Sequence, residues 1–281
     1  MIAGPTVRAL VLEAAVCVGL VALAVLVWNP LLVALAMIAI ATRQHALFIL
    51  YHDAVHGLIA KPLRLNDAII NLFAGVPMAL PVHVYRSLHM VHHRTLGTDR
   101  DPERVLLYTG QDWDYRPLPA RRLLRQLVFD TLLVNQLKTL WAYRREVGGH
   151  GVLKLPKNRW WPELAAMVVL FWGGFAAFAW MEPTLAARAA FVWGVPLVTL
   201  TQGIQKVRSF AEHAALDAPE LSYSWDPGLL GRIVLWPYNI QYHREHHEQP
   251  SIPWYRLPEV FPDRVARPGR GLLALLWNGA L

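Results

Sequence analysis

Eight of the twelve histidines in this sequence stand in three short clusters, and their spacing is typical of metal ligands. The clusters read HDAVH, HMVHH and HREHH and cover residues 52–56, 89–93 and 243–247. On a helix, positions i, i+3 and i+4 lie on the same face, so each cluster would aim its imidazoles at one point. Neutral imidazole is a common ligand of iron, zinc, copper and nickel. Because one tetrahedral zinc uses only four ligands, eight histidines favour two metal ions.

Ordinary histidines of the surface or core are the simpler explanation for any one cluster taken alone. Two HxxHH clusters and one HxxxH cluster, each beside an apolar span, favour metal binding instead. The zinc-peptidase pentad HExxH does not occur in the sequence, which excludes that class. His45 could share the face of the first cluster, whereas His83 and His150 stand alone and are expected to be ordinary polar residues.

Four apolar runs separate these clusters, at about residues 9–28, 31–51, 162–181 and 185–203. Each is close to the roughly 20 residues that cross a bilayer as a helix. Apolar residues make up 55% of the chain and charged residues only 17%, whereas soluble domains carry about 25% charged residues. The sequence therefore predicts an all-α integral membrane protein with four transmembrane helices in two hairpins.

The polar segments, residues 52–161 and 206–281, hold 24 of the 27 basic residues. By the positive-inside rule both segments are predicted to be cytoplasmic. They would form a helical cap that holds all three clusters on one side of the membrane, within a single domain of residues 1–281. Residues 68–82 are apolar but too short for a span, so we expect a re-entrant or interfacial segment. Residues 123–141 are expected to form an amphipathic surface helix.

The charge and the cysteine content limit the partners. The formal net charge is +7, but the apolar spans make nucleic acid an unexpected partner, and anionic lipid headgroups or an acidic protein suit this charge. Cys17 is the only cysteine, so there is no intrachain disulfide and no cysteine-ligated iron–sulfur cluster, and electrons must come from another molecule. Arg86, Arg94 and Arg100 could meet a headgroup or a redox partner, or be part of the general cytoplasmic charge.

The three clusters, in this order, resemble those of the membrane fatty acid desaturase superfamily, over roughly residues 30–260. The matching motifs are His52-Asp53 with Gly57, the segment GTDRDP at 97–102 and the segment PWYRLP at 253–258. The resemblance implies a helical membrane protein in which two iron ions use O₂ to oxidise a lipid or acyl substrate. It also implies an external electron donor, either a ferredoxin or a cytochrome with its reductase.

The resemblance adds a ninth ligand. Family members carry a further histidine after the fourth span, often in the context Arg-x-x-x-Glu-His, and RSFAEH at 208–213 matches that pattern. Acyl-CoA desaturases often have asparagine one turn before this histidine, where the present sequence has Ser209. No catalytic residue is expected beyond the metal ligands. The expected ligands are His52, His56, His89, His92, His93, His213, His243, His246 and His247.

Polar side chains next to these ligands could orient them. A metal-bound imidazole usually donates its second N–H to a carboxylate or a carbonyl. Ordinary ion pairing with Arg208 or Arg244 is the alternative role for the acidic ones. The candidates are Asp53, Ser209, Glu212 and Glu245.

Three functions stay open at this point. We favour desaturation of a fatty acyl chain of a lipid, because segments 208–213 and 253–258 are more similar to bacterial acyl desaturases than to ketolases. A carotenoid or lipid hydroxylase or ketolase of the same superfamily is the first alternative, since both reactions begin with removal of one hydrogen. A non-catalytic membrane metal-binding or transport protein is the second. Transport would favour ionisable groups in mid-membrane, whereas these histidines lie at span ends.

Overall fold

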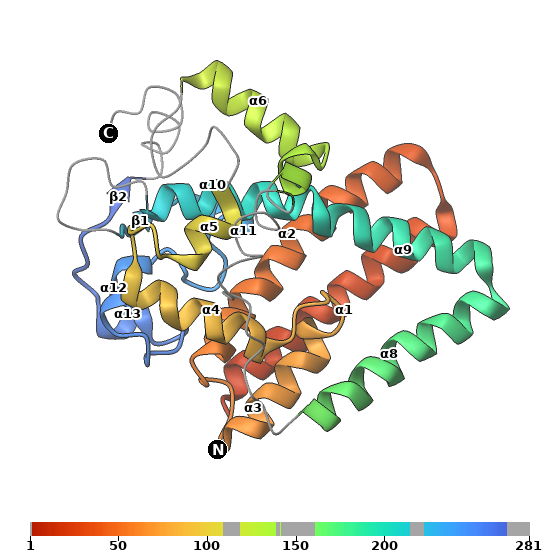
Figure 1. The fold of residues 1–281 in the computed structure, drawn as a ribbon, viewed down its shortest axis with the longest axis horizontal. Helices are drawn as coiled ribbons and strands as arrows, with labels where there is room; N and C mark the ends of the chain where they lie inside the picture. Colours follow the sequence, from red (N-terminus) through yellow and green to blue (C-terminus); the bar gives the residue numbers. More distant parts are fainter. Residues whose placement is uncertain (1, 109–118, 139–140, 142–160, 214–221, 269–281) are drawn as a thin grey trace. The chain divides into compact units, whose positions relative to one another are not determined.

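The part of the chain that the structure describes is mainly helical and contains one pair of very short strands (Figure 1). The computed structural model describes residues 2–108, 119–138, 141, 161–213 and 222–268. The chain divides into two compact units, which are described separately. Unit 1 comprises Met1–Arg86 and Pro156–Thr201, and unit 2 comprises Ser87–Leu155 and Gln202–Leu281.

Four helical stretches within the described residues are long and apolar enough to cross a membrane, the number that the sequence predicts. The first is α1 (Gly4–Val27) and the second is α2 (Pro30–Val55). Helix α2 continues to Val55, past residue 51, where the predicted span ends. Hydropathy marks the end of the apolar run, whereas the helix itself continues as long as its backbone hydrogen bonds do. The first histidine cluster therefore forms the last turn of α2.

The third and fourth stretches are α8 (Trp161–Met181) and the run Pro183–His213. That run consists of α9 (Pro183–Val198) and α10 (Leu200–His213). They are separated at Thr199, which has φ −120° and ψ −88°, three residues after Pro196. A proline inside a helix removes a backbone donor and bends the helix, which accounts for the interruption.

Helix α2 is central to unit 1. Helix α1 packs along α2, α9 packs on both, and α8 packs on α9 (Figure 1). Every residue from Gln44 to Val55 is buried, so the end of α2 is an interior part of this unit. The apolar contact among α1, α2 and α9 is made by Ala24, Val33, Ala36, Ile40 and Val192.

Polar side chains connect the same helices. Nη1 of Arg43 donates to Oε1 of Glu13 at 3.0 Å and so links α2 to α1. Nε2 of Gln44 donates to the carbonyl of Trp193 at 2.8 Å, and the hydroxyl of Thr201 donates to Oε1 of Gln44 at 2.8 Å. Because hydrocarbon offers no hydrogen-bond partner, such groups in a spanning helix must find partners within the protein.

The apolar segment at residues 68–82 is not one of the four candidate spans. It contains the end of α3 (Leu63–Ile70) and a single π-helical turn, η1 (Asn71–Gly75). Oδ1 of Asn71 accepts a hydrogen bond from the amide of Val82 at 2.9 Å, which ties this segment to the start of the next helix.

Unit 2 contains short helices that carry most of the histidines. Helix α4 (Val82–Thr95) starts in unit 1 and continues into unit 2. The other elements of unit 2 are α5 (Pro102–Tyr108), α6 (Ala120–Thr131), most of α10, α11 (Leu229–Val234), α12 (His243–Glu248), α13 (Leu257–Val260) and the parallel strands β1 (Trp225–Asp226) and β2 (Arg267–Pro268).

The prediction of one helix over residues 123–141 is wrong in its extent. Helix α6 ends at Thr131, and Leu133 has φ 63°, in the left-handed region that stops a helix. Residues 134–138 are helical again, so the predicted helix is interrupted at 132–133. Nδ2 of Asn135 donates to the carbonyl and to Oε1 of Gln126, at 3.1 and 3.0 Å, and so joins the residues after the break to α6. Both of these polar side chains are buried, so this face of α6 is an interior face.

Candidate metal centre

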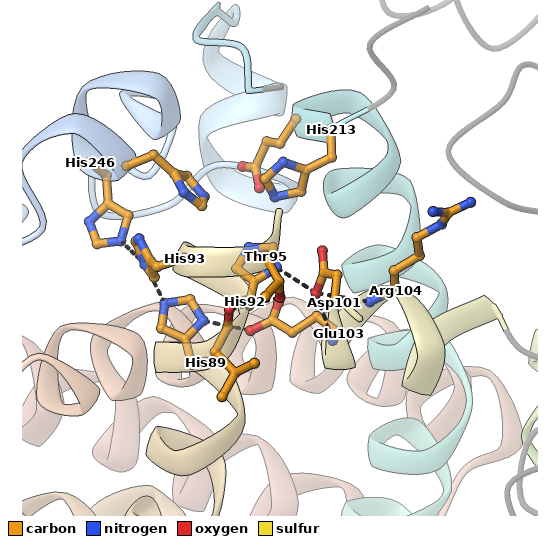
Figure 2. Close-up of polar contacts among 12 residues, drawn as sticks. His89, His92, His93, Thr95, Asp101, Glu103, Arg104, His213 and His246 are labelled. Atoms are coloured by element: carbon orange, nitrogen blue, oxygen red, sulfur yellow. Dashed lines mark hydrogen bonds and ion pairs between the residues drawn. The ribbon is translucent and has the colours of Figure 1, made fainter. Parts of the chain in front are cut away.

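Unit 2 brings seven of the nine expected ligands together. Figure 2 shows His89, His92, His93, His213 and His246 of this set. Helix α4 supplies three of them, the last residue of α10 supplies one, and α12 supplies three. Their imidazole nitrogens fall into two groups, which we call the first and the second imidazole group. The first group is His89, His93 and His246, and the second is His92, His213, His243 and His247.

In the first group, Nε2 of His93 lies 2.9 Å from Nε2 of His89 and 3.3 Å from Nε2 of His246. The ligand nitrogens of all three lie within 4.8 Å of one another. Residues 153 positions apart thus meet through side chains of α4 and α12.

In the second group, Nε2 of His243 lies 3.0 Å from Nε2 of His213 and 3.1 Å from Nε2 of His247. His92 joins His213 and His247, with ligand nitrogens within 4.8 Å of one another. Nε2 of His92 is buried and has no hydrogen-bond partner among the described residues.

Each HxxHH cluster is therefore divided between the two groups, and does not point to one place. Neighbouring residues on an α-helix differ by about 100° in direction, because a turn takes about 3.6 residues. His89 and His93, four residues apart, stay together, while His92 points to the other group. The same holds on α12, where His243 and His247 stay together and His246 goes to the first group.

The arrangement of nitrogens fits a metal ion better than a set of hydrogen bonds. A neutral imidazole nitrogen carries either one hydrogen or one lone pair. Nε2 of His93 nevertheless faces the Nε2 atoms of both His89 and His246, and Nε2 of His243 also faces two others. A cation at the centre of each group would use all of these lone pairs at once. All-imidazole donor sets suit iron, zinc and copper.

Two carboxylates fix the direction of two histidine rings on α4. Oε1 of Glu103 lies 2.5 Å from Nδ1 of His89, and Oδ1 of Asp101 lies 2.9 Å from Nδ1 of His92 (Figure 2). A carboxylate is an acceptor, so it holds the imidazole hydrogen on Nδ1 and leaves the lone pair on Nε2, toward the group. The sequence analysis did not identify either acid as such.

The start of α5 places both acids. Oδ1 of Asp101 accepts from the amides of Glu103 and Arg104, at 3.0 and 3.4 Å, as an N-cap side chain does. Pro102 follows as the first helical residue, a position that suits proline. The Asp-Pro pair in the matching motif at 97–102 is thus a helix start, and it was the signal that could have revealed Asp101.

Glu212 has the ion-pairing role that the sequence left open, and it also lies beside the nitrogen of His243 that faces the second imidazole group. Its carboxylate pairs with Arg208 on the same helix and accepts from Nε1 of Trp236 at 3.1 Å. Its Oε2 also lies 3.5 Å from Nε2 of His243. The carboxylate is therefore held beside the second imidazole group. Trp236 is a further residue that the sequence analysis missed.

The remaining polar candidates have different surroundings. Glu245 accepts from the hydroxyl of Ser224, which itself accepts from the amide of Arg244 at 3.1 Å, and so it secures the start of α12. Ser209 is buried on α10, one turn before His213. Asp53 is buried in the last turn of α2.

Burial keeps most of these imidazoles neutral. Burial, aided by the neighbouring His89 and His92, lowers the pKa of His93 to about 3. Burial and the surrounding histidines lower the pKa values of His243 and His247 well below their ordinary value. For His92, burial lowers the pKa, but the carboxylates of Glu103 and Asp101 outweigh it and raise the pKa. Neutral imidazole is the form that binds a metal.

Unit 1 holds the other two expected ligands, at the end of α2. His52 is buried and His56 is half-buried, and their rings lie edge to face with centroids 5.3 Å apart. His45 is fully buried in the same helix, and His83 packs its ring on Trp161 at 4.4 Å, as expected of an ordinary residue. His150 lies outside the described residues.

The chain is similar in sequence to known desaturases and ketolases. The fatty acid desaturase family profile matches residues 12–275. The dihydrorhizobitoxine desaturase of Bradyrhizobium elkanii is 28% identical over 87% of this chain and 71% of its own length. The sphingolipid delta(4)-desaturase of Candida albicans is 24% identical over 80% of this chain and 60% of its own length. The beta-carotene ketolase of Paracoccus sp. (strain PC1) is 27% identical over 83% of this chain and 80% of its own length.

No solved structure matches the chain. The family profile covers most of the sequence, including all three histidine clusters, and the relatives are desaturases and ketolases of one superfamily. The chain therefore belongs to the fatty acid desaturase family.

Proposed function

We propose that this protein is a membrane oxidoreductase that uses two iron ions and O₂ to introduce a double bond into a fatty acyl chain of a lipid. The observation that carries the proposal is the pair of imidazole groups, with carboxylates behind two of their members. Family membership supports the same chemistry.

The ligand set that we propose has nine histidines. One iron ion would be bound by the first imidazole group and the other by the second. We also assign His52 and His56 to this two-iron centre. The reason is the order of the three clusters along the sequence, which resembles the family pattern. Nine imidazoles exceed what one ion of any common coordination number uses, which supports a pair of ions.

Iron supplies, when bound, the O₂-dependent oxidation that an unactivated C–H bond requires. The protein's own groups prepare the site for it. Glu103 and Asp101 hold the Nδ1 hydrogens of His89 and His92, so that Nε2 is free to bind. The burial of His89, His92 and His243 keeps water away from the ligands.

Desaturation requires an electron donor besides O₂. Loss of two hydrogens from –CH₂–CH₂– and full reduction of O₂ to two waters require two further electrons and two protons. We infer that a separate ferredoxin, or a cytochrome with its reductase, supplies these electrons, because Cys17 is the only cysteine in the chain. A small acidic donor would suit the basic charge of the chain.

The proposed topology has four spans in two hairpins, α1 with α2 and α8 with α9 and α10. The concentration of basic residues in segments 52–161 and 206–281 favours a cytoplasmic cap that carries the metal ligands. The packing of α1 on α2 and of α8 on α9 supports the hairpins.

The second candidate is a hydroxylase or ketolase. The observation that favours it is the similarity to two beta-carotene ketolases. This chain aligns with 80% of the length of each, at 26–27% identity. Removal of one hydrogen is common to both reactions, so the ligands alone do not separate them. A non-catalytic membrane metal-binding or transport protein stays the alternative from another class.

Mass spectrometry of the lipids from cells that express the protein tests the proposal. Loss of two hydrogens from an acyl chain would support desaturation, whereas a gain of oxygen alone would favour the second candidate. Replacement of His92 and His246 by Ala, one ligand from each imidazole group, should abolish the product while the protein still enters the membrane. His83→Gln is the matched control, since this histidine of α4 packs on Trp161 and should leave the product unchanged. An unchanged product from the double variant would refute the ligand assignment.

A further inference from the structure

Arg86 is not a surface charge. The sequence suggested contact with a headgroup, contact with a redox partner, or general cytoplasmic charge. The structure shows its side chain only 18% exposed and directed toward the end of α2. Its guanidinium makes four hydrogen bonds within unit 1.

Two of these contacts are with carbonyls of the last turn of α2. Nε of Arg86 donates to the carbonyl of Val55 at 2.7 Å, and Nη2 donates to the carbonyl of Ala54 at 2.9 Å. The other two are with Asp67 of α3: Nη1 donates to Oδ2 at 2.9 Å and Nη2 to Oδ1 at 2.6 Å. Arg86 therefore makes a bidentate ion pair with Asp67 and also bonds the C-terminal end of α2.

The end of α2 needs such partners. Gly57, with φ +72°, stops the helix, and its amide donates to the carbonyl of Ala54 at 3.0 Å, while the amide of Leu58 donates to the carbonyl of Asp53 at 3.2 Å. This is the Schellman pattern of a helix C-terminus. The last carbonyls of a helix lack helical partners and carry partial negative charge, so a buried guanidinium there is favourable.

Asn66 adds a further connection at the same place. Its Nδ2 donates to the carbonyl of Ala54 and to Oδ1 of Asp67, both at 2.9 Å, and its Oδ1 accepts from the amide of Ile59 at 3.0 Å. Asn66 is fully buried. It therefore fastens both the last turn of α2 and the loop that follows it to α3.

We propose that Arg86, Asp67 and Asn66 form a clamp that positions His52 and His56 as metal ligands. This α2 clamp holds the carbonyls of Ala54 and Val55, which lie between the two histidines in the same turn. The inference rests on the proposed function, since it concerns ligands of the proposed centre.

The position of His56 makes it sensitive to the clamp. His56 is the residue at which α2 ends, with φ −82° and ψ 0°, so the direction of its ring depends on how the last turn is held. His52 lies one turn earlier, with its ring 5.3 Å from that of His56. A metal ligand has to be held within about 0.5 Å of its productive position. Fraying of this turn would misplace both rings.

A second buried pair in unit 1 provides a matched control. Arg43 and Glu13 are as buried as Arg86 and Asp67, with side chains 21% and 5% exposed against 18% and 9%. They also join two helices of unit 1, but Arg43 stands nine residues before His52 and reaches Glu13 on α1, not the carbonyls of Ala54 and Val55 that Arg86 bonds. Loss of either pair should reduce stability, and only loss of the clamp should affect metal binding.

The experiment measures Fe²⁺ binding by the full-length purified protein, with iron per chain determined by elemental analysis. Arg86→Gln should weaken the binding of the iron that His52 and His56 hold by about 10- to 100-fold. This is the range seen when the supporting contacts of a metal ligand are removed. Arg86→Lys should also weaken it, since lysine keeps the charge toward Asp67 but lacks the planar fork that reaches both carbonyls. Arg43→Gln should retain wild-type iron affinity, even if its melting temperature falls as much as that of Arg86→Gln.

Unchanged iron affinity in Arg86→Gln would overturn the clamp, and so would an equal loss in Arg43→Gln. If Arg86→Gln does not fold, Asn66→Ala removes a neutral part of the clamp, and wild-type iron affinity in that variant would overturn the inference. A wild-type chain that binds no iron would refute the proposed function and the clamp together. A wild type that binds iron, with a clamp variant that binds it equally well, would refute the clamp alone.

Discussion

Asp101 lies 2.9 Å from Nδ1 of His92, and neither side chain is exposed to solvent. The same carboxylate caps α5 and so places Glu103, two residues later, against His89 (Figure 2). One helix start thus orients a histidine of each imidazole group. This relationship leads to the first of four predictions.

Asp101→Asn should weaken iron binding with little loss of stability. Asparagine caps a helix about as well as aspartate, so α5 should keep its start. The amide lacks the charge that holds the hydrogen on Nδ1 of His92, and we expect iron affinity to fall by about 10- to 100-fold. Iron titration beside thermal unfolding checks this. Asp99→Asn is the control, because that side chain is 99% exposed and pairs with Arg104 only at the surface; an equal effect there would contradict the assignment.

Removal and replacement of the metal should separate stability from activity. Chelation should lower the melting temperature, because a ligand at about 100 times its Kd stabilises the folded state by about 2.7 kcal/mol. Fe²⁺ should restore both stability and O₂-dependent turnover. Zn²⁺ should restore stability alone, since it has no redox chemistry. Turnover with zinc as the only metal would contradict the oxidoreductase proposal.

A reporter fused after Trp161 should give a cytoplasmic signal. The preceding segment is basic, and α8 begins at that residue. A reporter placed at Glu182, in the turn between α8 and α9, should give the opposite signal. Protease protection or alkaline phosphatase and fluorescent protein fusions measure both. The same signal at both positions would refute the second hairpin.

Turnover should stop after one cycle when no reductant is present. Each desaturation requires two electrons from outside the chain, and the chain has one cysteine and so cannot bind a cysteine-ligated cluster of its own. Oxygen consumption with and without a ferredoxin or cytochrome system measures this. The rate with an acidic donor should fall as salt increases, because charge attraction speeds association. Sustained turnover without any donor would contradict the prediction.

Local features of the sequence predict the spans and the ligands. Hydropathy over about 20 residues depends only on neighbouring side chains, so the four spans were found, although the ends of α2 and α10 were placed too early. The histidine spacing is equally local. It singled out six of the seven histidines that the two imidazole groups contain, and the resemblance to the family added His213.

The tertiary structure decided how these residues combine. Local spacing placed His89, His92 and His93 on one helix, but their division between two groups depends on where α10 and α12 bring His213 and His246. Glu103 was not identified from the sequence either, because a carboxylate in a polar loop carries no sign of the imidazole that it will meet.

Arg86 shows the same limit most clearly. From the sequence, three roles were open for Arg86: contact with a headgroup, contact with a redox partner, or general cytoplasmic charge. The structure instead buries it against Asp67 and the last carbonyls of α2. The physical reason is that a helix end exposes backbone acceptors at a point in space, and only the packing of distant segments determines which side chain reaches them. The sequence by itself determined which residues could bind metal, and the fold decided which partners hold them in place.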